Sequence, residues 1–158
     1  MATIILYATK YGATEQIAKR ISTLLDDAPY HNLKDKNLPP LSDFDTIIIG
    51  ASVYAGNARK EARHFLLQNQ ALLMEKNVSF FLSGISERDD DPDTFFKKNV
   101  PAELLQKARA TGFLGGIYDP KKVSGFERFI MKQVVKHDAF VDCVRESAIK
   151  TFAAKTQE

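Results

Sequence analysis

The sequence predicts a doubly wound α/β protein with five parallel strands in the order 2-1-3-4-5, covered by helices on both faces. Short, almost continuous apolar runs rich in β-branched residues recur along the chain, which is typical of strands buried on both faces. Apolar residues at helical spacing follow most of these runs, and such βαβ units build a parallel sheet. The 158 residues can bury one sizeable core, and no linker divides them, so we expect residues 1–158 to form a single domain.

The first half of the chain contains two strand-helix units with a weaker strand between them. Thr14 and Glu15 supply a cap region and a first-turn acid for the first helix. A polar connection through Pro39-Pro40 cannot stay helical and separates the weak strand from the second unit. We therefore expect strands over residues 3–8, 29–33 and 45–51, and helices over 14–25 and 61–67.

The second half begins with a strong strand over residues 77–83 and continues, past an acidic loop over 87–93, into a partly helical segment over 95–108. We expect the last strand over residues 111–118, and its glycines would allow close approach of another group. Two helical patterns follow, and the second contains Cys143 among apolar residues, which predicts a buried, inert thiol. We place these last helices at residues 126–135 and 140–154.

Composition excludes several classes of function. A formal charge of +2 is too small for a protein whose affinity comes from contacts with nucleic-acid phosphates. A single cysteine cannot form an internal disulfide, which fits a reducing cytoplasm, and no apolar run approaches the ~20 residues that span a bilayer. The histidines lack metal-ligand spacing, so we assign no role to His31, His64 and His137.

In a doubly wound sheet, ligands bind beyond the carboxyl ends of the strands, so the loops there are the candidate sites. The first loop lacks both GxxxxGK[ST] and GxGxxG, but it places hydroxyl residues around a glycine just before a helix. The unpaired N–H groups at such a helix start favour a phosphate monoester, while the alternative is an ordinary turn with a threonine cap. The candidate phosphate-binding residues are Thr9, Lys10, Tyr11, Gly12, Ala13 and Thr14.

The second and third loops combine small residues with one aromatic, which suits a planar heteroaromatic ligand. Tyr54 would stack on the ring, whereas the alternative packs Tyr54 on a neighbouring helix. Residues 50–54 nearly match the serine-hydrolase motif GxSxG, but Tyr54 replaces the last glycine. The polar edge of the ring would meet the third loop. The candidate residues are Ser52, Val53, Tyr54, Ala55, Gly56, Ser83, Gly84 and Ile85.

The acidic loop invites a calcium interpretation, which its spacing does not support. Counting from Asp89 puts Thr94 at the position of the invariant glycine and Val100 at the position of the bidentate acid. We therefore expect a solvated acidic turn and no metal site.

Together the three loops resemble the flavodoxin-like family, whose members bind FMN. Thr9-Lys10-Tyr11-Gly12-Ala13-Thr14 is similar to its phosphate loop, although Lys10 and Tyr11 stand where many members have small or hydroxyl residues. Ile49-Gly50-Ala51-Ser52 with Gly56, and the segment Phe126-Glu127-Arg128-Phe129-Ile130-Met131-Lys132, look most like the menaquinone-dependent protoporphyrinogen IX dehydrogenases.

This resemblance implies an FMN-dependent oxidoreductase that moves electrons from a hydrophobic, porphyrin-type substrate to a quinone. No acid–base catalytic residue is needed, because the flavin carries the chemistry. Two alternatives stay open: a flavodoxin that shuttles electrons between redox partner proteins, and an interaction domain that binds no FMN.

The segment from Lys121 to Lys136 is amphipathic. Its apolar stripe comprises Phe126, Phe129, Ile130 and Val134, and its basic face comprises Arg128, Lys132 and Lys136. The ordinary behaviour of amphipathic helices predicts that the stripe packs on the sheet. The alternative is peripheral contact of residues 126–136 with a partner or with the inner face of the cell membrane, which would bring the flavin near a membrane quinone.

Overall fold

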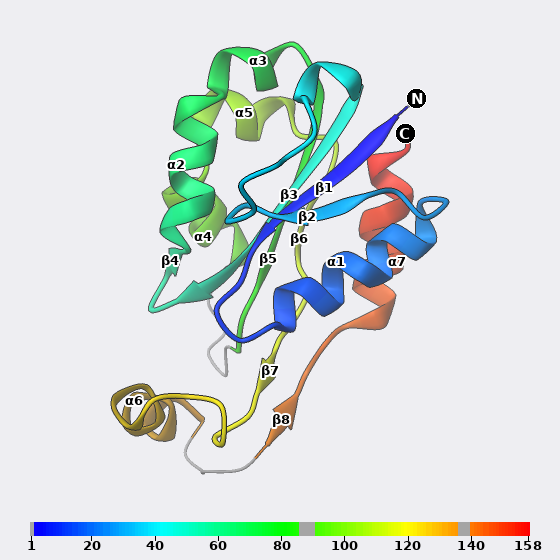
Figure 1. Cartoon of the computed structure of the whole chain (residues 1–158). Coiled ribbons are helices and arrows are strands. Elements are labelled where there is room, and N and C mark those ends of the chain that lie inside the picture. The colour runs from blue at the N-terminus through cyan, green and yellow to red at the C-terminus, as the bar shows by residue number, and fades with distance from the viewer. Residues whose placement is uncertain (1, 86–90, 136–139) are drawn as a thin grey trace.

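The computed structural model describes residues 2–85, 91–135 and 140–158. Its main sheet has the strand order β2-β1-β3-β5-β6, with all four of these pairings parallel, so the predicted fold class is confirmed (Figure 1). A short antiparallel strand, β4 (Asn57–Ala58), joins the end of β3 and was not predicted. The parallel strands are β1 (Thr3–Ala8), β2 (Tyr30–Asn32), β3 (Thr46–Tyr54), β5 (Asn77–Ser83) and β6 (Thr111–Phe113).

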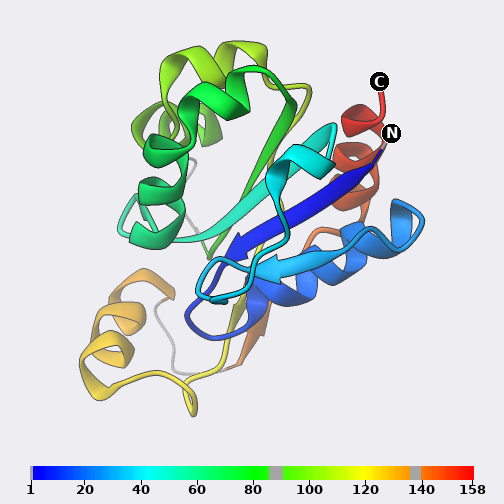
Figure 2. The same ribbon diagram turned by 45° about the horizontal axis from the view of Figure 1, so that its top comes forward.

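Helices cover both faces of this sheet (Figures 1 and 2). One face carries α1 (Ala13–Leu24) and α7 (Glu146–Thr156). A 3₁₀ turn, η1 (Leu41–Asp43), precedes β3. The other face carries α2 (Lys60–Gln68), α3 (Gln70–Met74), α4 (Pro92–Asn99) and α5 (Ala102–Lys107).

Alternation along the strands divides the core between these two layers. Ile4 and Leu6 of β1 pack under α2 to α5, whereas Ile5 and Tyr7 pack under α1 and α7. All four side chains are buried, because successive residues of a strand point to opposite faces. Burial on both faces is the physical reason for the uninterrupted apolar runs in the sequence.

The start of α1 differs from the predicted cap. Gly12 is the N-cap residue, with a left-handed φ of 95° and no side-chain cap, and Thr14 lies inside the first turn. A left-handed conformation at this point favours glycine, so the glycine of the first loop turns the chain from β1 into α1.

The predicted last strand is divided into two. After β6, the chain turns at Gly115 (φ 81°) and forms β7 (Ile117–Tyr118), which pairs antiparallel with β8 (Val141–Asp142). The predicted helix over 140–154 is therefore wrong at its start, because residues 141–142 pair with β7 and α7 begins only at Glu146.

Cys143 was expected to be buried in a helix, and this expectation is wrong. Its thiol is exposed, and its backbone N–H donates to the carbonyl of Gly116 at 2.9 Å. Pairing with a segment 27 residues earlier in the chain removes Cys143 from the helical pattern.

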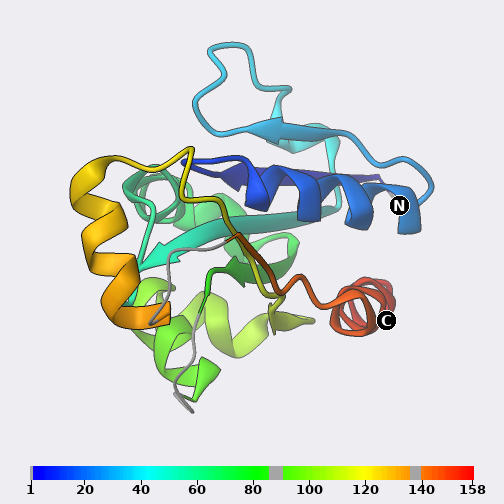
Figure 3. The ribbon, with the colours of Figure 1, turned by 90° about the horizontal axis from the view of Figure 1, so that it is seen from below.

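The helix α6 (Gly125–Val135) confirms the predicted helix over 126–135, but not the expected packing of its stripe. Phe126 and Phe129 are 73% and 60% exposed. Figure 1 shows α6 set apart from both helical layers, and Figure 3 views the end of the sheet beside which it lies. Lys136 and the side chain of Val134 lie outside the described part of the chain.

Tyr7 makes the fold sensitive to alkaline pH. Burial, with smaller contributions from Glu15, Asp35 and Tyr30, raises the pKa of Tyr7 to about 12. Because the folded state favours the neutral phenol, this stabilisation is complete below about pH 10 and is lost as the pH rises towards about 12. We expect the free energy of unfolding, measured by urea titration, to fall over this interval and to fall less in Tyr7→Phe. Equal pH dependence in both proteins would contradict the assignment.

Candidate functional site

The three predicted loops meet at the carboxyl end of the sheet. They follow β1, β3 and β5, and β3 pairs with both of the other strands. The hydroxyls of Thr14 and Ser83 lie 2.7 Å apart, which joins the first loop to the third. A Cβ atom on Gly84 would lie 3.2 Å from the carbonyl oxygen of Val53, so the second and third loops also approach closely.

The first loop presents backbone donors rather than free hydroxyls. The Thr9 hydroxyl accepts a hydrogen bond from the N–H of Gly12 at 3.0 Å, and Thr14 is fully buried against Ser83. Among the described residues, the N–H groups of Tyr11, Ala13 and Thr14 donate no hydrogen bond within the protein. These amides gather at the start of α1, where the helix dipole adds positive potential. The arrangement fits a phosphate monoester.

The second loop is shorter than predicted. β3 continues through Ser52 and Val53 to Tyr54, and the chain reverses at Ala55 and Gly56, both with positive φ, to enter β4. Tyr54 is 44% exposed at this turn, which leaves ring surface open to a ligand. Gly84 and Ile85, at the end of β5, are half-buried.

Asn99 holds the turn of the second loop and was missed from the sequence. Its buried amide accepts a hydrogen bond from the N–H of Ala58 at 2.9 Å and donates to the carbonyl of Gly56 at 3.0 Å. The sequence offered no signal for this role, because the burial of Asn99, which requires partners for its amide, is visible only in the structure. Asn99 therefore acts as a support for the loop that carries Tyr54.

Glu127 of α6 is the second residue that was missed. Its two carboxylate oxygens contact Lys10 Nζ and the Tyr11 hydroxyl, so the Glu127 side chain attaches α6 to the first loop. The Glu127 side chain is 17% exposed, far less than Phe126 and Phe129 of the apolar stripe. The available signal was its charge, because Glu127 is the sole acid between Lys121 and Lys136.

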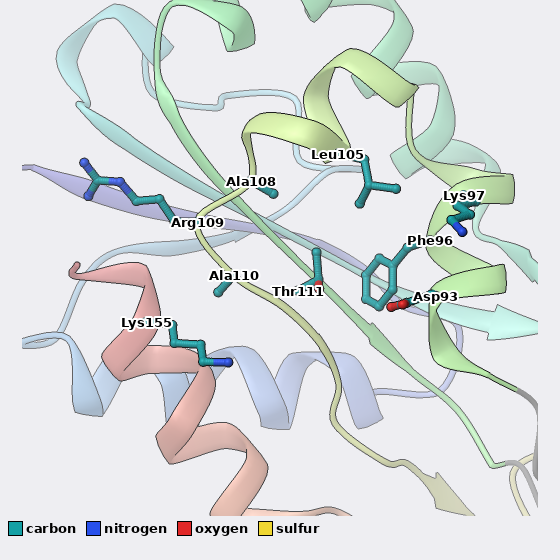
Figure 4. A pocket seen from close by; sticks show the side chains of 9 residues that line it. All are labelled: Asp93, Phe96, Lys97, Leu105, Ala108, Arg109, Ala110, Thr111 and Lys155. Carbon is teal, nitrogen blue, oxygen red and sulfur yellow. The ribbon is translucent and has the colours of Figure 1, made fainter.

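A hollow of about 360 Å³ lies elsewhere, beside the edge strand β6 (Figure 4). Lys155 of α7 and Lys97 of α4 lie on either side of Thr111 in this view. None of its lining residues belongs to the three loops, so the predicted site is not this hollow. The lining residues are Asp93, Phe96, Lys97, Leu105, Ala108, Arg109, Ala110, Thr111 and Lys155.

The acidic turn before α4 has a structural role where it is described. Asp91 Oδ1 accepts a hydrogen bond from the N–H of Asp93 at 3.0 Å and caps α4, while residues 86–90 and His137 lie outside the described part of the chain. The described part of the chain contains no cluster of three or more metal-ligating side chains. Within the same ranges, no helix combines the length and hydropathy needed to cross a membrane.

Comparison with known proteins adds a family model and several relatives. The model described as "Flavodoxin domain" matches residues 4–140. The chain is 21% identical over 163 residues to the protoporphyrinogen IX dehydrogenase [quinone] of Escherichia coli, covering 96% of this chain and 88% of that protein. Among solved structures it resembles oxidised flavodoxin 2 of Bacillus cereus, with a TM-score of 0.59, 20% identity and coverage of 99% and 98%. A Lactobacillus acidophilus flavoprotein in complex with FMN has a TM-score of 0.56, 14% identity and coverage of 71% and 92%.

Proposed function

The chain belongs to the flavodoxin domain family, and from this membership we propose that it binds FMN at the three loops and transfers electrons through it. The observation that carries this proposal is the set of open amides at the start of α1, in a loop turned by Gly12. FMN accepts a hydride or single electrons, so the protein has to bind it, tune it and admit a partner.

Each loop then has its own task. The backbone of residues 10–14, with Lys10, would hold the phosphate, and the Thr9 hydroxyl would keep the loop in shape. Tyr54 would stack on one face of the ring system, and Gly84 and Ile85 would meet its edge. The remaining predicted residues, Ser52, Val53, Ala55, Gly56 and Ser83, would form the walls between these contacts.

For the reaction, we infer oxidation of a hydrophobic substrate of the protoporphyrinogen type with a quinone as acceptor. The similarity to the E. coli enzyme over 96% of the chain supports this choice. The alternative function is an electron shuttle between proteins, which the flavodoxin structures support.

We also propose that α6 docks on the surface of an anionic membrane, where an apolar quinone would be found. Phe126 and Phe129 lie three residues apart on one helix and are largely exposed. Lys121, Lys122, Arg128 and Lys132 lie in or just before the same helix and are exposed as well. Exposed aromatic residues beside basic ones are the pattern of an interfacial helix.

Tyr54→Ala is expected to weaken FMN binding about threefold to tenfold, because an aromatic stacking contact contributes roughly 0.5–1.5 kcal/mol. Tyr54→Phe is the matched control and should bind FMN almost as well as the natural protein, since it keeps the ring. Quenching of flavin fluorescence measures both affinities. Unchanged affinity in the alanine variant would mean that the ring stacks elsewhere.

The reaction is tested with the FMN-loaded protein under anaerobic conditions, using protoporphyrinogen IX and a soluble menaquinone analogue. We expect formation of protoporphyrin, followed by its absorbance, to depend on both FMN and the quinone. A fully loaded protein that gives no turnover but exchanges electrons rapidly with redox proteins would be a shuttle. A protein that does not bind FMN at all would overturn both functions.

A further inference from the structure

The carboxylate of Glu127 occupies the first loop in the way an anionic ligand would. Both of its oxygens are engaged, one by Lys10 Nζ and the other by the Tyr11 hydroxyl, two consecutive residues of the loop. Glu127 follows these residues by more than a hundred positions in the chain, so the contact is a tertiary one. It places a negative charge at the ends of two side chains of the same loop whose backbone amides open at the start of α1.

A bound phosphate monoester and the Glu127 carboxylate would therefore meet at one cation. Lys10 is the only basic residue of the first loop, and Glu15 in the first turn of α1 adds a further negative charge. A phosphate dianion would repel Glu127 and would draw Lys10 towards itself, because charges a few ångströms apart interact strongly near a protein surface. Binding of the phosphate therefore disfavours the contact of Glu127 with the loop, and that contact disfavours binding of the phosphate.

We propose that Glu127 is a positioning residue that couples the cofactor to α6. The phosphate of FMN and the carboxylate of Glu127 compete for Lys10 and Tyr11 of the first loop. This inference rests on the proposed function, since it takes FMN as the ligand of the first loop. Coupling of this kind is reciprocal, so Glu127 lowers the affinity for FMN by the factor by which FMN loosens α6.

Glu127 lies within the helix that is proposed to dock on the membrane, so its contact with the first loop also affects that helix. Glu127 lies between Phe126 and Arg128 of the proposed membrane-docking helix. While Glu127 contacts the first loop, this contact ties α6 to the body of the protein. When phosphate displaces Glu127, this tie is lost and α6 is held less firmly. Loading with FMN would then make the helix available to the membrane, so the protein would dock once it can transfer electrons.

The test compares the natural protein with Glu127→Gln and with the control Glu146→Gln. Like Glu127, Glu146 pairs with a cation: it lies 2.6 Å from Arg20. Arg20 is in α1, about two turns beyond the first loop, so this pair does not involve the loop. We expect Glu127→Gln to bind FMN about tenfold more tightly, a typical size for coupling between sites. Binding of riboflavin, which lacks the phosphate, should not change in either variant. A role of Glu127 in general stability would shift both ligands alike.

The release of α6 is measured separately by limited trypsin digestion at Arg128 and Lys132, both exposed. We expect FMN to accelerate cleavage there in the natural protein and in Glu146→Gln, whereas Glu127→Gln should be cleaved rapidly with or without FMN. Weaker or unchanged FMN binding by Glu127→Gln, or equal tightening for riboflavin, would overturn the proposal.

If no variant binds FMN, the proposed function fails, and inorganic phosphate then tests the coupling by itself. Cleavage in α6 of the natural protein should still accelerate with phosphate and not with the same concentration of chloride. The absence of any phosphate effect would overturn the coupling as well.

Discussion

Replacing Phe126 and Phe129 together by serine is expected to weaken binding to anionic vesicles by roughly a hundredfold. Both side chains are more than half exposed and lie on one helix, so both can enter the interface together. Partial burial of two phenylalanine side chains contributes about 3 kcal/mol, which corresponds to about two powers of ten in affinity. Co-sedimentation of the FMN-loaded protein with vesicles of phosphatidylglycerol and phosphatidylcholine measures this loss.

Leu67→Ser is the matched control. Leu67 of α2 is 66% exposed, comparable to the two phenylalanines, but it lies on a different helix. Binding of this variant should equal that of the natural protein. If the phenylalanine double variant still binds fully, or if Leu67→Ser loses as much, α6 is not the docking element.

Gly115→Ala is expected to destabilise the protein by about 3 kcal/mol or more. Gly115 has a φ of 81°, which costs a non-glycine residue about 1–3 kcal/mol. In addition, a Cβ atom there would lie 2.0 Å from the carbonyl oxygen of Cys143, and backbone atoms cannot move aside as a flexible side chain can. A loss of this size lowers the melting temperature of a protein of this length by about 10 °C, which calorimetry resolves.

Gly125→Ala is the control for this substitution. Gly125 begins α6, its φ is not in the left-handed range, and a Cβ atom there would meet nothing within 4 Å. Alanine also favours a helix over glycine by up to about 1 kcal/mol. Gly125→Ala should therefore be neutral or slightly stabilising. Equal stability of both alanine variants would show that the close approach at Gly115 carries no cost.

The parallel strands could be predicted because their burial is visible in the order of the residues. β5 runs over Asn77–Ser83, the predicted range, since a strand covered on both faces is rich in apolar residues, here Val78 and residues 80–82. The end of the chain could not be predicted in the same way. Residues 140–154 carry a helical spacing throughout, but Val141 pairs with Tyr118, a partner that no local pattern reveals.

The turn of the first loop was predictable to the same extent, whereas its role as a binding site stays a prediction. The glycine and hydroxyl pattern indicated this turn, because it reflects a local requirement of the chain as it enters α1. The partners of its side chains were not visible: Thr14 meets Ser83 and Lys10 meets Glu127, and both contacts depend on how distant segments fold together. The hydroxyls of Thr9 and Thr14 have partners within the protein, which leaves the backbone amides as the open groups of the loop.

The antiparallel pair β7 and β8 makes residues 119–140 a removable insertion. Tyr118 and Val141 are direct partners at the end of a two-strand ladder, so a two-residue turn such as Asn-Gly could connect them. The register of the main sheet would not change, since neither β7 nor β8 belongs to it. The protein can thus be regarded as a flavodoxin domain with a transplantable extension, and the same extension could be grafted between paired strands of another member of the family.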